Sequence, residues 1–127
     1  MTLNEYFKST KGVGVLSTAD KDGHVNAAIY SRPHSMEDGS LAFIMRNRLT
    51  HSNIQSNPYA VYLFKEDGPE YKGKRLYLTK TREEEESDLL YRLRRKDYDM
   101  DKDPKDPKFL VFFKLEKELP LVGSGDR

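Results

Sequence analysis

The stretch VGVLSTADKDGHVNAAIYSR, residues 13–32, decides the fold. Two short runs rich in Val, Ala and Ile flank the segment DKDG at residues 20–23, whose glycine can take the positive φ that a tight turn needs. In the second run, residues 25, 27, 29 and 31 alternate with residues 24, 26, 28, 30 and 32, as on the two faces of a strand. We therefore expect an antiparallel hairpin whose strands are residues 13–19 and 24–32.

The rest of the chain continues this pattern of short strands and turns. We expect strands at residues 41–45, 59–64, 74–81 and 108–117, and helices over residues 50–57 and 83–96. A first short helix begins at the capping box formed by Thr2 and Glu5 and is stopped by Gly12, and Thr50 is the expected N-cap of the second helix. The sequence thus predicts a mainly β fold with a few short helices. Its six antiparallel strands are expected to close into a barrel, because an open sheet would expose two pairing edges.

Length and composition indicate one folded domain. Of the 127 residues, we assign residues 1–118 to a single domain and residues 119–127 to a flexible tail. The net charge of +1, from 22 Lys and Arg against 21 Asp and Glu, does not favour a protein that wraps duplex DNA. The absence of cysteine excludes disulfides, thiolate metal sites and a Cys nucleophile. Because the sequence has no signal-peptide pattern and no membrane-length apolar run, we expect a soluble cytoplasmic protein.

Two familiar motifs are incomplete. The acidic run at residues 97–103 lacks the glycine and glutamate that a calcium-binding EF-hand loop requires, so we interpret it as a solvated linker. The segment GVG at residues 12–14 lacks the third glycine of a dinucleotide-binding turn. His24, His34 and His51 do not have the i, i+4 spacing of a helical zinc site. We therefore expect no bound metal.

Charge is unevenly distributed along the chain. Residues 1–64 carry 11 charged side chains and residues 65–127 carry 32, and the only arginines of the first half are Arg32, Arg46 and Arg48. Arg46 and Arg48 lie between an expected buried strand and the helix that begins at Thr50. Backbone amides at a helix N-terminus, together with two guanidinium groups, are suited to bind a phosphate monoester. The alternative is that both arginines are ordinary exposed residues at a strand end and that Thr50 only caps the helix.

Taken in order, these segments resemble the pyridoxamine 5'-phosphate oxidase-like family of FMN-binding split β-barrels. The resemblance covers about residues 5–115 and is most specific at residues 14–30 and 41–61, where Asn57-Pro58 precedes an apolar strand. It implies a six-stranded antiparallel split β-barrel of Greek-key topology that binds FMN, with FAD or a deazaflavin as alternatives. It also implies a homodimer with flavin sites at the interface.

The same resemblance implies a set of binding residues. Arg46, Arg48 and Thr50 would bind the flavin phosphate, with Arg32 as a further charge. The family often places Lys at the position of Thr50, and Arg48 would supply that charge. The flavin ring would lie along Asn26, Ala27, Ala28, Ile29 and Tyr30.

The implied function is that of a flavin-dependent oxidoreductase or electron-transfer protein that acts through the flavin N5. It is not expected to be a pyridoxamine 5'-phosphate oxidase itself, because the chain is short and shows no equivalent of that enzyme's C-terminal substrate-binding segment. The flavin carries the chemistry in such proteins, so the sequence assigns no catalytic residue. A redox partner or small-molecule substrate is expected but not identified, and neither a membrane nor a nucleic acid is expected as a partner.

Two other functions stay open at this stage. A small barrel can bind nucleic acid through arginines and exposed tyrosines, although this chain has no lysine-rich stripe. A barrel that has lost its cofactor can serve as a dimeric sensor or scaffold. Residues 109–113, FLVFF, are apolar on both faces of their strand, which is more than the interior of a small barrel can use, and we interpret this excess as the interface of the expected homodimer.

Overall fold

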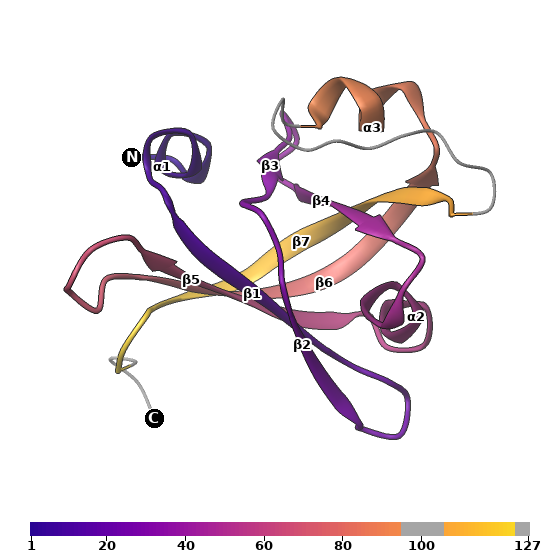
Figure 1. Ribbon diagram of the computed structural model, residues 1–127, viewed down its shortest axis with the longest axis horizontal. Helices are drawn as coiled ribbons and strands as arrows, with labels where there is room; N and C mark the ends of the chain where they lie inside the picture. Colours follow the sequence, from indigo (N-terminus) through magenta and orange to yellow (C-terminus); the bar gives the residue numbers. More distant parts are fainter. Residues whose placement is uncertain (95–105, 124–127) are drawn as a thin grey trace.

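Seven antiparallel strands form one strongly bent sheet in the computed structural model, which describes residues 1–94 and 106–123 (Figure 1). Three short helices accompany this sheet. In chain order the elements are α1 (Leu3–Ser9), β1 (Gly12–Ala19), β2 (Val25–Ile29), β3 (His34–Ser35), β4 (Leu41–Arg46), α2 (Leu49–Ser56), β5 (Tyr59–Glu66), β6 (Gly73–Glu85), α3 (Asp88–Leu93) and β7 (Lys108–Pro120).

The strand order is β2-β1-β5-β6-β7-β4-β3, and every pairing is antiparallel. β5, β6 and β7 are consecutive neighbours, and β4, which precedes them in the chain, lies beside β7; this is a Greek-key arrangement. The predictions of a mainly β, antiparallel, Greek-key fold and of the hairpin at residues 20–23 are therefore confirmed.

Two details of the predicted barrel are wrong. The sheet has seven strands rather than six, and it does not close, because in the described residues β2 pairs only with β1 and β3 only with β4. The additional strand, β3, has two residues and pairs with Leu41 and Ala42 alone. It follows Pro33, which lacks the N–H that a ladder needs, and is followed by the turn around Gly39. Within the described part of the chain, residues 43–46 of β4 consequently have no strand on their outer side.

The interior of the bent sheet is filled mainly by aromatic side chains. Tyr62, Phe64, Phe43 and Phe113 are fully or almost fully buried, and Phe43 contacts Tyr62 with 5.0 Å between ring centroids. The Tyr62 hydroxyl donates to the Tyr30 carbonyl at 3.0 Å and passes directly over Gly14, where a Cβ would lie 1.8 Å from that hydroxyl. A glycine is therefore required at position 14. α1 closes one end of this core through Tyr6 and Phe7.

A second core lies on the other face of β4 and β7, beneath α3. It consists of Ala42, Leu90, Leu110 and Phe112, and all four residues are buried. Residues 109–113 are therefore buried on both faces within the single chain, which overturns their interpretation as a dimer interface. The apolar excess has a different cause: one face of β7 fills the sheet interior and the other is covered by α3, which lies beside β3 and β4 in Figure 1.

Several predicted boundaries need correction. Glu83–Glu85 belong to β6, which pairs with β7 as far as Phe109, so the helix predicted from residue 83 begins only at Asp88. β2 ends at Ile29, three residues before the predicted end, and α1 ends at Ser9, whereas Gly12 begins β1. β7 continues to Pro120, beyond the predicted start of the tail. The predicted helix end at residue 96, the linker at residues 97–103 and the last four residues lie outside the described residues.

The second core predicts the effect of shortening its central side chain. Leu90→Ala should destabilise the protein by about 2–5 kcal/mol, because it leaves a cavity between α3 and β7. Urea unfolding followed by circular dichroism measures this loss. Val122→Ala, at a position that is 65% exposed, is the matched control and should change stability by less than about 0.5 kcal/mol. If Leu90→Ala lost as little stability as the Val122→Ala control, the result would contradict the assignment of α3 as a core element.

Candidate functional site

A cavity of about 770 Å³ lies between the two unpaired edges of the sheet. One wall is β2 with the residues that follow it, and the other is β4 with the start of α2. Such a volume is typical of a site for a small molecule or cofactor. Among the residues predicted to bind a flavin, Asn26, Ala28, Ile29, Tyr30, Arg32, Arg46, Arg48 and Thr50 line this cavity, whereas Ala27 does not.

The β2 wall follows from the alternation of its side chains. Asn26 and Ala28 are half-buried on the cavity side, and Val25, Ala27 and Ile29 are exposed on the opposite side. Ile29 still contributes to the cavity lining although it is 72% exposed. Beyond the strand, the Tyr30 ring packs edge-to-face on Phe43 at 6.1 Å between centroids. An aromatic and small-residue wall of this kind can accept a flat ring.

The start of α2 differs from the prediction. α2 begins at Leu49 with Arg48 as its N-cap residue, and no side chain caps it. Thr50, the predicted N-cap, is instead a buried helical residue whose Oγ1 accepts from Asn26 Nδ2 at 3.3 Å. The first N–H groups of a helix have no partner inside the helix, so an uncapped N-terminus at the cavity wall presents amide donors to a ligand.

Polar side chains attach α2 to three different strands. Each of these contacts joins a buried helix residue to the sheet, and together they fix the helix at its first two turns. They are Thr50–Asn26 on β2 at 3.3 Å, Asn53–Thr18 on β1 at 3.1 Å, and His51–Glu83 on β6 at 3.1 Å.

The three arginines of the first half have different environments. Arg32 Nη1 donates to the carbonyls of Phe7 and Thr10 at 2.8 and 3.0 Å and so caps the end of α1. Arg46 binds the Asp106 carboxylate through Nε, at 3.1 Å, and through Nη2. The Arg48 side chain makes no hydrogen bond or ion pair with any described residue. Of the three, Arg48 is therefore the one whose whole guanidinium is available to a ligand.

Asp106 is the counter-ion at this end of the cavity. The hydrogen bond from Arg46 lowers the pKa of the Asp106 carboxyl, aided by the charges of Arg46, Lys108 and Arg48. Asp106 therefore stays ionised and compensates part of the positive charge. Among the described residues that line the cavity itself, none is acidic.

Sequence reasoning missed the environment of His51. This side chain is 6% exposed, its ring stacks on Phe109 at 3.8 Å between centroids, and its Nε2 lies 3.1 Å from a Glu83 carboxylate oxygen. Burial raises the pKa of Glu83, but hydrogen bonds from Lys80, Gln55 and His51 outweigh burial and lower that pKa to about 2. The pair could not be found from the sequence because Glu83 was assigned to a helix rather than to β6.

Two further cavity residues, His34 and Arg94, were also not predicted. His34 is in β3, which was not recognised as a strand, and Arg94 follows α3 directly. Their position at the cavity depends on how α3 packs against β4, which residue patterns do not show.

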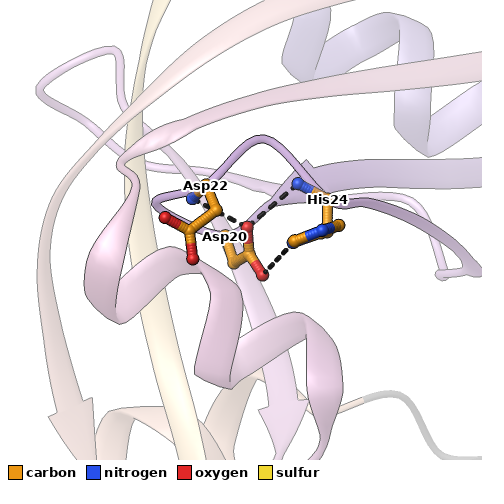
Figure 2. A group of neighbouring side chains, drawn as sticks. All are labelled: Asp20, Asp22 and His24. Carbon is orange, nitrogen blue, oxygen red and sulfur yellow. Dashed lines mark hydrogen bonds and ion pairs between the residues drawn. The ribbon is translucent and has the colours of Figure 1, made fainter.

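Asp20, Asp22 and His24 form a polar cluster at the hairpin between β1 and β2 (Figure 2). Asp20 Oδ1 accepts the backbone amides of Asp22 and His24, each at 2.9 Å, and Asp20 Oδ2 lies 3.1 Å from His24 Nδ1. These bonds, first of all the one from the His24 amide, lower the pKa of Asp20. Asp20 therefore uses its oxygens to hold the turn, and the exposed cluster is explained by the hairpin alone.

The outer face of β1, β2 and β5 carries apolar side chains that no described residue covers, and on β6 the same face carries Arg75, Tyr77 and Thr79. Register places Val15, Leu63 and Ile29 side by side on this face, and Val25 is 83% exposed. A shallow groove of about 610 Å³ crosses it between Tyr59 and Tyr77. A contiguous exposed apolar surface on a folded domain is typical of an interaction site.

None of the helices in the described part of the chain is both long enough and apolar enough to span a membrane.

Several solved structures share the fold of this chain. An FMN-binding protein from Syntrophomonas wolfei subsp. wolfei has a TM-score of 0.71 and 21% identity over 96% of this chain and 85% of its own. A candidate pyridoxamine 5'-phosphate oxidase from Lactobacillus delbrueckii has a TM-score of 0.66 and 18% identity over 92% and 89% of the two chains. An F420 reductase has a TM-score of 0.65 and 15% identity over 90% and 94%. No protein-family model and no curated protein matches the sequence.

The low pKa of Glu83 predicts how stability depends on pH. A carboxyl whose pKa is lower in the folded state stabilises the fold above its unfolded pKa, and this contribution is lost as pH falls through the folded value of about 2. Glu83→Gln should therefore reduce stability at neutral pH and flatten the decline between about pH 5 and pH 2. The urea concentration at the midpoint of unfolding, measured for both proteins at several pH values across this range, tests this prediction. Glu37→Gln, in an exposed turn, should keep the wild-type pH profile, and an unchanged profile in Glu83→Gln would contradict the ionised pair.

Proposed function

We propose that this protein, which has the pyridoxamine 5'-phosphate oxidase-like split-barrel fold, binds FMN and functions as a flavin-dependent oxidoreductase or electron-transfer protein. The observation that carries the proposal is the start of α2. An uncapped helix N-terminus and the Arg48 guanidinium meet at the wall of a ligand-sized cavity, which is an arrangement that binds a phosphate group.

The described residues fit a flavin in three respects. Arg48 and the first amides of α2 suit the phosphate, and Arg46 adds positive charge beside them. Asn26, Ala28 and Tyr30 provide a wall of small, polar and aromatic side chains for the ring. The absence of an acidic side chain from the described lining favours an anionic ligand. When bound, the flavin supplies redox chemistry at its N5 atom.

The chain's own residues have positioning roles in this proposal. Thr50 and Asn26 join α2 to β2, so the phosphate and ring regions are held at a fixed separation. Tyr30 is fixed from both sides, because its carbonyl accepts from Tyr62 and its ring packs on Phe43. A wall that is already rigid loses little conformational entropy when it binds a flat ring.

The proposal includes a homodimer that forms through the outer sheet face. Continuity supports this choice, since β2 and Ile29 belong both to that face and to the cavity lining. Burial of Val25, Leu63 and their neighbours against a second copy would remove the exposed apolar surface from water. The second copy would then lie beside the cavity.

Replacing Arg48 tests the phosphate site. Arg48→Gln should weaken FMN binding by about 1.5–3 kcal/mol, the scale of a hydrogen bond to a charged group, and leave riboflavin binding unchanged because riboflavin has no phosphate. Quenching of flavin fluorescence in titrations with both ligands measures the difference. Lys21→Gln, in the hairpin turn, is the charge-matched control and should bind FMN as the wild type does.

Two results would contradict the proposal. A colourless wild-type protein that neither quenches FMN fluorescence nor gains thermal stability with FMN would overturn flavin binding and favour a cofactor-free or nucleic-acid-binding barrel. If Arg48→Gln loses affinity equally for FMN and riboflavin, the phosphate lies elsewhere.

The dimer is tested by placing a charge on the outer face. Leu63→Asp, at the centre of that face, should convert the dimer to a monomer, because the interface would have to bury a carboxylate. Analytical ultracentrifugation at micromolar concentration reports the change, and Val122→Asp outside the face serves as the control. A variant that sediments as a dimer, or a wild type that sediments as a monomer, would exclude this interface.

A further inference from the structure

The cavity extends from the start of one helix to the end of another. α2 contacts the far part of β1, where Asn53 bonds Thr18 at 3.1 Å, whereas α1 ends just before β1 begins at Gly12. The two helices therefore lie at opposite ends of β1 (Figure 1). Residues from both ends line the cavity, with Arg48 at the start of α2, and Gly12 and Arg32 beside α1.

Strand register shows how far apart these two ends are. On β2, Asn26 pairs with Thr18 at the α2 end, and the Tyr30 amide donates to the Gly14 carbonyl at 2.9 Å towards the α1 end. Four residues of extended strand span about 13 Å. Arg32 follows Tyr30, so it lies at the end of the β2 wall that is remote from the start of α2.

Arg32 is held in place by the last turn of α1. Its Nη1 donates to the carbonyls of Phe7 and Thr10 at 2.8 and 3.0 Å. The last carbonyls of a helix have no partner inside the helix, and a cation is favourable beside them. Among the described residues these two carbonyls are the only acceptors of the Arg32 side chain, so the N–H groups of Nε and Nη2 are available to a ligand.

α1 is itself fixed to the sheet by its aromatic side chains. The Phe7 ring packs edge-to-face on Phe64 at 5.3 Å between centroids, and the Tyr6 hydroxyl donates to a Glu66 carboxylate oxygen at 2.7 Å. Phe7 thus contributes a ring to the core and a carbonyl to Arg32. The position of the guanidinium at the cavity wall therefore depends on the docking of α1.

We propose that Arg32 joins the flavin ring to α1. Nη1 holds the carbonyls of Phe7 and Thr10, and the other two guanidinium nitrogens donate to a carbonyl oxygen of the ring. An arginine side chain has donors and no acceptor, and one edge of a flavin ring carries carbonyl oxygens whereas the other carries methyl groups. The carbonyl edge therefore faces α1.

The inference rests on the proposed function and adds to it the orientation of the ring. It also makes α1 responsive to the ligand. Because one guanidinium serves both groups, the bound ring stabilises the docking of α1, and docked α1 strengthens the binding of the ring by the same factor.

The experiment uses the full chain as wild type and as Arg32→Gln, with riboflavin, FMN, 2-thioriboflavin and 4-thioriboflavin as ligands. Each thio analogue replaces one ring carbonyl oxygen with sulfur, which is a weaker acceptor. Fluorescence quenching or flavin absorbance measures the affinities. Amide hydrogen exchange measures the protection of α1, and thermal unfolding verifies that the variant is folded.

The wild type should bind riboflavin more tightly than one of the two thio analogues. Arg32→Gln should weaken riboflavin binding by about tenfold or more and remove this preference. It should weaken FMN binding by the same factor, so that the ratio of the two affinities is unchanged, whereas Arg48→Gln is expected to change that ratio. In the wild type, saturating riboflavin should slow exchange in α1, and the less preferred thio analogue should slow it less.

Two control variants separate this contact from a general loosening of α1. Thr2→Ala removes the capping box at the other end of the helix, so it should speed exchange in α1 but keep the preference for riboflavin over the thio analogue. Lys8→Gln removes an exposed positive charge from the last turn of α1, outside the cavity lining, and should leave both flavin affinities at their wild-type values.

Three results overturn the inference while flavin binding stands. Arg32→Gln could keep the preference for riboflavin over the thio analogue, as a purely structural residue would. It could weaken FMN and not riboflavin, which would assign Arg32 to the phosphate. Riboflavin could leave exchange in α1 of the wild type unchanged, and this measurement decides the matter even if the variant does not fold. A wild type that binds neither FMN nor riboflavin overturns the proposed function, and this inference with it.

Discussion

The sheet does not close, and the candidate site depends on that opening. In a closed barrel of this size, side chains fill the interior and every strand has two neighbours. Here β3 is only two residues long, so among the described residues most of β4 lacks an outer partner, and β2 at the opposite end of the strand order lacks one as well. The cavity lies between these two edges. The same feature that leaves backbone groups unpaired thus provides the space and the polar surface for a ligand.

The arginines show that residues of one type near one cavity can have different roles. Arg32 satisfies two carbonyls at the end of α1, and Arg46 neutralises Asp106, so both contribute to holding the cavity walls together. Arg48 has no such described partner and lies at the uncapped start of α2. The distribution of charge along the sequence detects this group of arginines but not their different roles. Those roles depend on contacts with α1 and Asp106, which are distant in the chain.

Local patterns predicted the elements that depend on neighbouring residues. The hairpin at residues 20–23, the capping box of Thr2 and Glu5, and the end of α2 at Asn57 are all present, since each is decided within a few residues. The features that the local patterns did not predict depend on long-range packing. Glu83 extends β6 rather than opening a helix because β7 offers it a pairing partner, and residues 109–113 are apolar on both faces because α3 covers one of them. The cavity residues on β2 and β4 were predicted from the order of segments, whereas the place of His34 and Arg94 at the cavity depends on the packing of α3.

The start of α2 connects the stability of the fold to the site. A helix N-terminus without a cap leaves amide groups unsatisfied, and such groups are normally a source of instability. α2 nevertheless keeps its position, because Thr50, His51 and Asn53 attach it to three strands through side-chain hydrogen bonds. The helix is therefore rigid without the ligand that would satisfy its amides. A ligand that supplies the missing acceptor then gains those hydrogen bonds without having to order the helix, and it stabilises the folded state in proportion to its affinity.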